Sequence, residues 1–171
     1  NVDDVLDRFP LHLKICRDCG LGQLGEYVLP DRIFHDTYPY FSSASETWVR
    51  HARKYAVEMQ DKLSLGSNTL VMELASNDGY LLSEFQKLGM PVLGVEPTEN
   101  TANLARKSGV PTVSEFFGEE LARKLLIEYG HPRVIVANNV YAHIPDMQDF
   151  TKGMAVLADD STIITIENPS F

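Results

Sequence analysis

The chain has 171 residues, of which 44% are hydrophobic and 23% charged, which is ordinary for a globular protein with one core and a small appendage. Its formal net charge of −9 argues against nucleic acid as a partner, because nucleic-acid binding requires a basic face. No apolar run approaches the roughly 18 residues that span a membrane and no signal peptide is visible, so we expect a cytoplasmic protein without a membrane partner.

Residues 1–30 are short segments punctuated by Cys and Gly, in which Leu11, Leu13 and Ile15 alternate like a strand. Cys16 and Cys19 have the spacing of half a zinc knuckle, whereas a structural zinc needs four ligands. Three interpretations stay open: a second Cys pair upstream of this chain, a bare thiol pair or disulfide, or a metal held with His12 or another residue. We expect a partial zinc-binding module here.

Residues 31–66 begin with an aromatic and polar segment, 38–43, followed by a predicted helix over 45–63 with apolar side chains at helical spacing. The segment either folds over a bound cofactor as a lid or packs as a linker on the following domain. As a lid it would bring the hydroxyl of Tyr38 to a substrate, where it can stabilise a developing enolate.

From residue 67 onward, predicted strands and helices alternate. We expect strands at 69–75, 91–95, 110–113, 133–137 and 162–167, and helices near 79–88, 98–107, 118–129 and 147–157. This alternation is typical of an α/β fold with a parallel sheet and helices on both faces. The strands are near-continuous apolar runs, as burial on two faces requires.

The first of these strands carries Glu73 and runs into a turn that ends at Gly79, and the second strand ends at Glu96, 23 residues after Glu73. An acid about 20 residues past the first turn is how Rossmann-like sheets hold a nucleoside ribose. Dinucleotide sites want three glycines, but here Ala75, Ser76, Asn77 and Asp78 fill the other positions of the turn. The side chains would crowd a pyrophosphate and the acids would repel it, which favours S-adenosylmethionine over NAD or ATP.

Further polar and aromatic residues follow the later strands. Phe116 and Phe117 follow the third strand, where one ring either flanks the adenine or packs in the core. Asn138 and Asn139 follow the fourth strand, at the edge where α/β sheets bind ligands. His143 lies in the loop beyond, where it is either an ordinary loop residue or a group that holds a proton near the reaction centre. The expected cofactor-binding residues are Glu73, Ala75, Ser76, Asn77, Asp78, Gly79, Glu96, Pro97, Phe116, Phe117, Asn138 and Asn139, and the expected catalytic residues are Tyr38 and His143.

Taken together, these motifs resemble the sugar C-methyltransferases of deoxysugar biosynthesis. The resemblance extends over nearly the whole chain and is carried by Leu13-x-x-Cys16-x-x-Cys19-x-Leu21-x-Gln23, Tyr38-Pro39-Tyr40-Phe41-Ser42-Ser43, Glu73-Leu74-Ala75-Ser76-Asn77-Asp78-Gly79, Gly94-Val95-Glu96-Pro97, Asn139-Val140-x-x-His143-Ile144-Pro145-Asp146 and Glu167-Asn168-Pro169. It implies a class I S-adenosylmethionine-dependent methyltransferase domain of Rossmann-like fold between a zinc-binding module and a substrate domain.

The resemblance further implies methylation of the carbon beside the keto group of a nucleotide-linked 4-keto-6-deoxysugar, through an enolate. It places Glu73, Asn77, Asp78, Gly79 and Glu96 at the cofactor, and Tyr38 and His143 near the sugar. The family's Tyr-x-Glu-His motif, which is thought to carry the base, its last sheet strands and its sugar-binding domain would lie beyond Phe171. We therefore expect a fragment that binds the cofactor without necessarily turning over.

Three rival functions stay open at this point. The first is a methyltransferase acting on oxygen or nitrogen, and the second is a non-catalytic module that holds a cofactor or a partner protein. The third is an NAD-dependent enzyme, which the missing glycines disfavour. The sequence pattern predicts no particular oligomeric state.

Overall fold

The computed structural model describes residues 9–25, 28–34 and 39–168. It divides into two compact units, Asn1–His35 and Asp36–Phe171. The sequence suggested boundaries after residues 30 and 66, whereas packing joins the helix of the middle region to the second unit. Within the described residues, no helix combines the length and apolar character that crossing a membrane would take.

The first unit contains an antiparallel hairpin and one short helix. Strands β1 (Leu13–Ile15) and β2 (Gly22–Leu24) pair with Leu13 opposite Leu24, and α1 (Pro30–Ile33) follows. Cys16 and Cys19 lie in the turn between the strands. The Cys16 amide donates to the Leu21 carbonyl at 2.9 Å, and Gly20 adopts a left-handed φ of 75°, which closes this turn.

The second unit is the expected α/β domain with a parallel sheet. Its strands are β3 (Val71–Leu74), β4 (Val92–Val95), β5 (Thr112–Val113), β6 (Val134–Asn138) and β7 (Ile163–Glu167). Its helices are α2 (Glu46–Leu63), α3 (Tyr80–Lys87), α4 (Glu99–Lys107), α5 (Glu119–Tyr129) and α6 (Met147–Leu157), with short 3₁₀ turns η1 (Ser42–Ala44) and η2 (Tyr141–His143). The strand order is β5-β4-β3-β6-β7, and all four neighbouring pairs are parallel.

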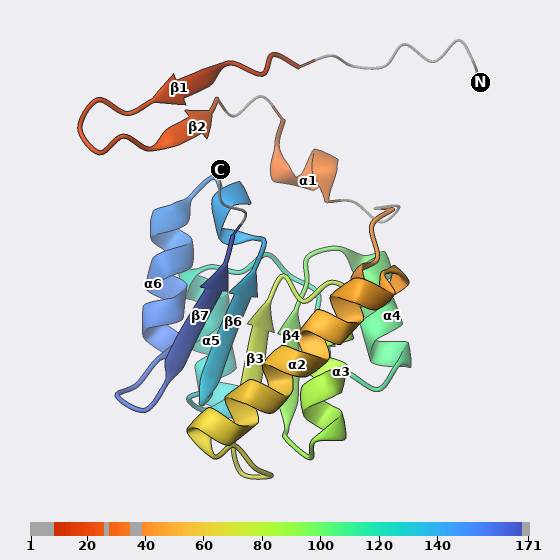
Figure 1. The fold of residues 1–171 in the computed structure, drawn as a ribbon. Helices are drawn as coiled ribbons and strands as arrows, with labels where there is room; N and C mark the ends of the chain where they lie inside the picture. Colours follow the sequence, from red (N-terminus) through yellow and green to blue (C-terminus); the bar gives the residue numbers. More distant parts are fainter. Residues whose placement is uncertain (1–8, 26–27, 35–38, 169–171) are drawn as a thin grey trace, which may run out of the picture. The chain divides into compact units, whose positions relative to one another are not determined.

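Helices cover both faces of the sheet, because successive strand residues point to opposite sides. Val71 and its neighbours on one face pack against α2, α3 and α4, and Met72 and its neighbours on the other face pack against α5 and α6. Figure 1 shows α2 in front of the sheet and α5 behind it. Strands β3 and β4 are buried along their whole length. Helix α2 contributes Ala52, Ala56 and Met59 at helical spacing, so its apolar stripe closes the first face.

Candidate functional site

The strand order identifies the point of the sheet at which folds of this kind bind ligands. From β3 the chain moves outward through β4 to β5, and it then returns to β6 on the other side of β3. The connections therefore diverge between the carboxyl ends of β3 and β6, which is the switch point at which open α/β sheets bind ligands. Glu73 near the end of β3 and Asn138 at the end of β6 flank this point.

The turn after β3 has an unusual backbone. Ala75, Asn77 and Gly79 adopt left-handed φ angles of 59°, 49° and 77°. Glycine adopts left-handed φ angles freely and Asn tolerates them, whereas for alanine this conformation costs about 1–2 kcal/mol. The turn therefore has the left-handed backbone angles expected of a glycine-rich turn, although the sequence supplies a single glycine. Left-handed residues of this kind concentrate at ligand sites, where the surrounding structure holds the strain.

Glu73 is the most informative side chain at the switch point. It is 1% exposed, and it lies between Gly94 of β4 and Val136 of β6 in the sheet. Its Oε2 atom has no hydrogen-bond partner among the described residues. Burial, followed by the negative charges of Glu96 and Asp78, raises the pKa of Glu73 well above its ordinary value. A buried carboxyl with one unpartnered oxygen, beside two other acids, is suited to receive a positively charged ligand group.

Glu96 is held against the same turn from the end of β4. Its Oε2 accepts the Asn77 amide at 2.9 Å, and its Oε1 accepts the Thr98 amide at 2.9 Å and the Thr98 hydroxyl. A carboxylate has about four acceptor positions, so three of them are occupied by protein donors. One position at Oε2 remains for a ligand hydroxyl, and a bidentate grip on two hydroxyls requires Thr98 to give way.

Comparisons with known proteins identify the fold of the second unit. No protein-family model matches the chain. The solved structure of DesVI from Streptomyces venezuelae superposes with a TM-score of 0.57 at 13% identity, over 75% of this chain and 53% of DesVI. A SAM-dependent methyltransferase from Archaeoglobus fulgidus gives 0.55 at 13% identity, over 69% and 53% of the two chains. The chain has the fold of the S-adenosylmethionine-dependent methyltransferases. The plantazolicin methyltransferase BpumL, in complex with a triazolic desmethylPZN analog and SAH, gives 0.56 at 11% identity, over 73% and 48%.

The chain is also similar in sequence to one named methyltransferase. The chain is 31% identical over 161 residues to C-methyltransferase NovU of Streptomyces niveus. That match covers 94% of this chain but 38% of NovU, so the chain spans a little over a third of the relative's length.

Asn77 and Asp78 use their side chains on the protein itself. Asn77 Oδ1 accepts the Ser42 amide at 2.9 Å, and its Nδ2 donates to the Tyr40 carbonyl at 3.1 Å. Both oxygens of Asp78 accept the Ser43 amide, at 3.0 and 3.3 Å. The aromatic segment that the sequence suggested as a lid or linker therefore lies against the turn at residues 40–43. Tyr38 falls outside the described residues.

Ser76 and the phenylalanine pair divide between the core and the surface. The Ser76 side chain is fully buried below the turn, where a Cβ at Gly94 would overlap its Oγ. Phe117 packs edge-on against Phe150 of α6 at 5.0 Å between ring centroids, so it belongs to the core. Phe116 is 51% exposed, which leaves its ring the freer of the two to contact an adenine.

The residues beyond the end of β6 lie where the sequence placed them. Asn139 has a left-handed φ of 52°, and its amide donates to the Glu167 carbonyl at 2.6 Å. His143 ends η2 and is exposed, and its amide donates to the Val140 carbonyl at 2.8 Å. Pro97 is half-buried directly after Glu96.

The sequence reasoning missed an aromatic and polar group that borders the switch point. Trp48 of α2 stacks on His51 at 5.3 Å and on Tyr80 at 6.4 Å between centroids, and His51 Nε2 lies 2.9 Å from Glu167 Oε2. Burial, followed by the charge of Glu73, raises the pKa of Tyr80. The signal was present: Trp48 and His51 share a face of α2, and Tyr80 directly follows Gly79.

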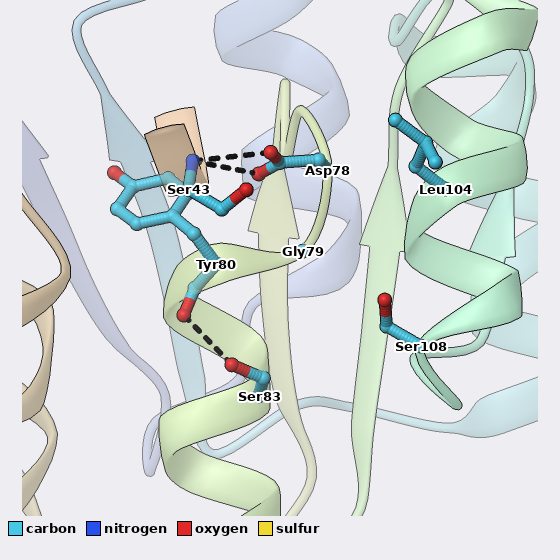
Figure 2. Close-up of a pocket in the computed structure, with 7 residues that line it drawn as sticks. All are labelled: Ser43, Asp78, Gly79, Tyr80, Ser83, Leu104 and Ser108. Carbon is cyan, nitrogen blue, oxygen red and sulfur yellow. Dashed lines mark hydrogen bonds between the residues drawn. The ribbon is translucent and has the colours of Figure 1, made fainter. Parts of the chain in front are cut away.

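A pocket of about 170 Å³ opens beside the turn, between α3 and α4. Figure 2 shows Ser43, Asp78 and Tyr80 near one another on one side of the pocket, with Leu104 on α4 and Ser108 directly after that helix on the other side. Its lining includes Asp78 and Gly79 of the turn but not Glu73, Glu96 or Asn138.

Among the described residues, no third metal ligand joins Cys16 and Cys19. The amides of Cys19 and Asp18 lower the pKa of the Cys16 thiol, as in a turn that supports a thiolate. However, no three His, Cys, Asp or Glu side chains gather to hold an ion within the described part of the chain. Two ligands do not fit a structural zinc, which needs four.

Proposed function

We propose that this chain is the cofactor-binding part of an S-adenosylmethionine-dependent C-methyltransferase whose substrate is a nucleotide-linked 4-keto-6-deoxysugar. The observation that carries the cofactor assignment is the buried, unpartnered Oε2 of Glu73 at the switch point. A pyrophosphate would meet negative charge there, whereas the ammonium and sulfonium groups of S-adenosylmethionine would be attracted. The methyltransferase fold and the similarity to NovU support the same assignment.

The residues present fit this cofactor. Glu73 would supply the countercharge for its amino-acid part, and the free acceptor position of Glu96 would take a ribose hydroxyl. The amides and tight curvature of residues 75–79 let the ligand approach the backbone closely. When bound, S-adenosylmethionine supplies an electrophilic methyl group.

The sugar and the carbon position are the finer part of the proposal. They rest on the resemblance of the motifs between Leu13 and Pro169 to sugar C-methyltransferases and on the similarity to NovU. His143, exposed beyond β6, would hold or move a proton near the sugar, and the hydroxyl of Tyr38 would stabilise the negative oxygen of an enolate.

The cofactor assignment predicts a large thermal shift. S-adenosylhomocysteine at 100 times its dissociation constant should stabilise the protein by about 2.7 kcal/mol, which raises the melting temperature by about 5–10 °C. Glu96→Ala should abolish the shift, and Glu99→Ala, three residues on and outside the turn, should keep it. A shift with NAD and none with S-adenosylhomocysteine would overturn the assignment. An undiminished shift in Glu96→Ala would place the ribose elsewhere.

The substrate assignment predicts a specific product from the full-length protein. Nucleotide-linked 4-keto-6-deoxysugars should gain one methyl group on the carbon beside the ketone, detected by mass spectrometry and carbon NMR. That carbon should also exchange hydrogen with deuterated water, since an enolate requires its proton to leave. Methylation of oxygen or nitrogen, or no reaction with any such sugar, would refute the substrate while leaving the thermal-shift result as evidence for the cofactor.

A further inference from the structure

Residues 40–43, here called the strap, precede α2 and are fastened to the turn by side chains 35 to 37 residues further along the chain. Asn77 bonds the strap backbone twice, through the Ser42 amide and the Tyr40 carbonyl. Asp78 accepts the next amide, that of Ser43, with both carboxylate oxygens, and Figure 2 shows these two bonds. Ser42 is buried, so the strap is part of the packed structure.

Asn77 combines two properties that its position demands. Its φ of 49° is left-handed, which Gly and Asn accept at the lowest cost among the residues. A glycine would fit this backbone but would offer no side chain to the strap, whereas the side-chain amide of Asn77 accepts one bond from the strap and donates another to it. The backbone N–H of Asn77 also donates to Glu96 Oε2. Asn77 therefore joins the turn, the end of β4 and the strap.

The strap is also held at its other end. Ser45 caps α2, accepting the Trp48 amide at 3.3 Å, and the helix then packs Ala52 and Ala56 into the core. Trp48 stacks on Tyr80, the first residue of α3. A backbone segment fixed at both ends beside the carboxyl end of β3 is ordered before any ligand arrives, so binding does not have to order it.

We propose that the strap is a wall of the cofactor site, and that Asn77 and Asp78 are positioning residues that hold it there instead of contacting the cofactor with their side chains. This proposal rests on the proposed function. It differs from the role that resemblance implied for these two residues, because their side-chain oxygens already accept backbone amides of the strap.

The decisive variant is Asn77→Gly, which keeps the backbone angle and removes the two bonds that Asn77 makes to the strap, while those of Asp78 remain. We expect it to fold with a melting temperature close to that of the wild type, to exchange the Ser42 and Ser43 amides faster in NMR, and to bind S-adenosylhomocysteine at least tenfold more weakly. The matched control is Ser64→Gly, because Ser64 also has a left-handed φ of 52° but lies at the C-terminal end of α2. It should leave exchange and affinity unchanged.

A second pair of variants tests Asp78. Asp78→Asn keeps an acceptor for the Ser43 amide and should retain most of the affinity, whereas Asp78→Ala should lose it as Asn77→Gly does. Unchanged affinity in Asn77→Gly and Asp78→Ala, or unchanged exchange at Ser42 and Ser43, would overturn the role of the strap. Failure of the wild type to bind S-adenosylhomocysteine would instead refute the proposed function.

Discussion

Replacing Glu73 with glutamine is expected to raise the melting temperature of the free protein at neutral pH and to abolish S-adenosylhomocysteine binding. The carboxyl is buried without a partner for Oε2 and beside two other acids, and an unsatisfied buried group costs about 1–3 kcal/mol, more when it is charged, so the uncharged amide relieves a cost of at least this order. Each kcal/mol corresponds to about 2–4 °C in a domain of this size. Binding suffers because the ligand's positive group loses its countercharge.

The pH dependence of this effect has a definite sign. The pKa of Glu73 is higher in the folded than in the unfolded protein, because burial and the charges of Glu96 and Asp78 raise it. Above the ordinary value of 4.5 the folded state therefore binds more protons than the unfolded state, and stability falls as the pH rises through this window. The advantage of Glu73→Gln should grow from pH 5 to pH 8 in thermal melts.

Glu84 supplies the matched control for Glu73, since it is also a buried glutamate, at 3% exposure. Its oxygens accept from Arg53 at 3.0 Å and Lys87 at 2.6 Å. Burial would raise the pKa of Glu84, but these partners outweigh it and lower the pKa. Glu84→Gln should therefore destabilise the protein at neutral pH. A loss of stability in Glu73→Gln at pH 8 would show that the Glu73 carboxylate has a partner.

Gly79→Ala is expected to cost about 2–5 kcal/mol of unfolding free energy and to impair cofactor binding. At the Gly79 φ of 77°, an alanine has a conformational free energy about 1–2 kcal/mol less favourable than glycine. The new Cβ would also lie 3.1 Å from Val110 Cβ and 3.2 Å from Ala105 Cβ, and such overpacking costs about 1–3 kcal/mol. The turn would have to move away from α4, which shifts the backbone that faces the ligand. Urea denaturation measures the first effect and calorimetry the second.

Gly109→Ala separates the two costs. Gly109 has a φ of 87°, and a Cβ there would meet nothing within 4 Å. This variant should lose only the backbone contribution of about 1–2 kcal/mol and should bind S-adenosylhomocysteine normally. If the two alanine variants lose equal stability and both bind, the close packing of Gly79 is not what shapes the turn.

The fold of the second unit could be predicted because most of its strands are near-continuous apolar runs bounded by turns. All five expected strands and all five expected helices form, with ends that differ by at most two residues. The predicted strand 69–75 stops at Leu74, because Ala75 turns left-handed. In the first unit, β2 and the four-residue α1 escaped prediction, since segments this short have too few residues to show a period.

Only the residues of the candidate site that lie at the ends of strands could be predicted from the sequence. Glu73 and Asn138 lie where the alternating pattern put them. The bonds from Asn77 and Asp78 to the strap were not predictable, because a side chain that bonds a distant backbone amide leaves no pattern in the sequence. The sequence also gives no sign that Phe117 packs on Phe150 while the adjacent Phe116 stays exposed.

The most direct test of the central claim is a crystal structure of the full-length protein with S-adenosylhomocysteine. We predict that the amino-acid part of the ligand lies against Glu73 and the turn 75–79, with a ribose hydroxyl on Glu96 Oε2 and the strap beside it. A ligand bound away from the switch point between β3 and β6, or one that leaves Glu73 Oε2 unpartnered, would contradict the account.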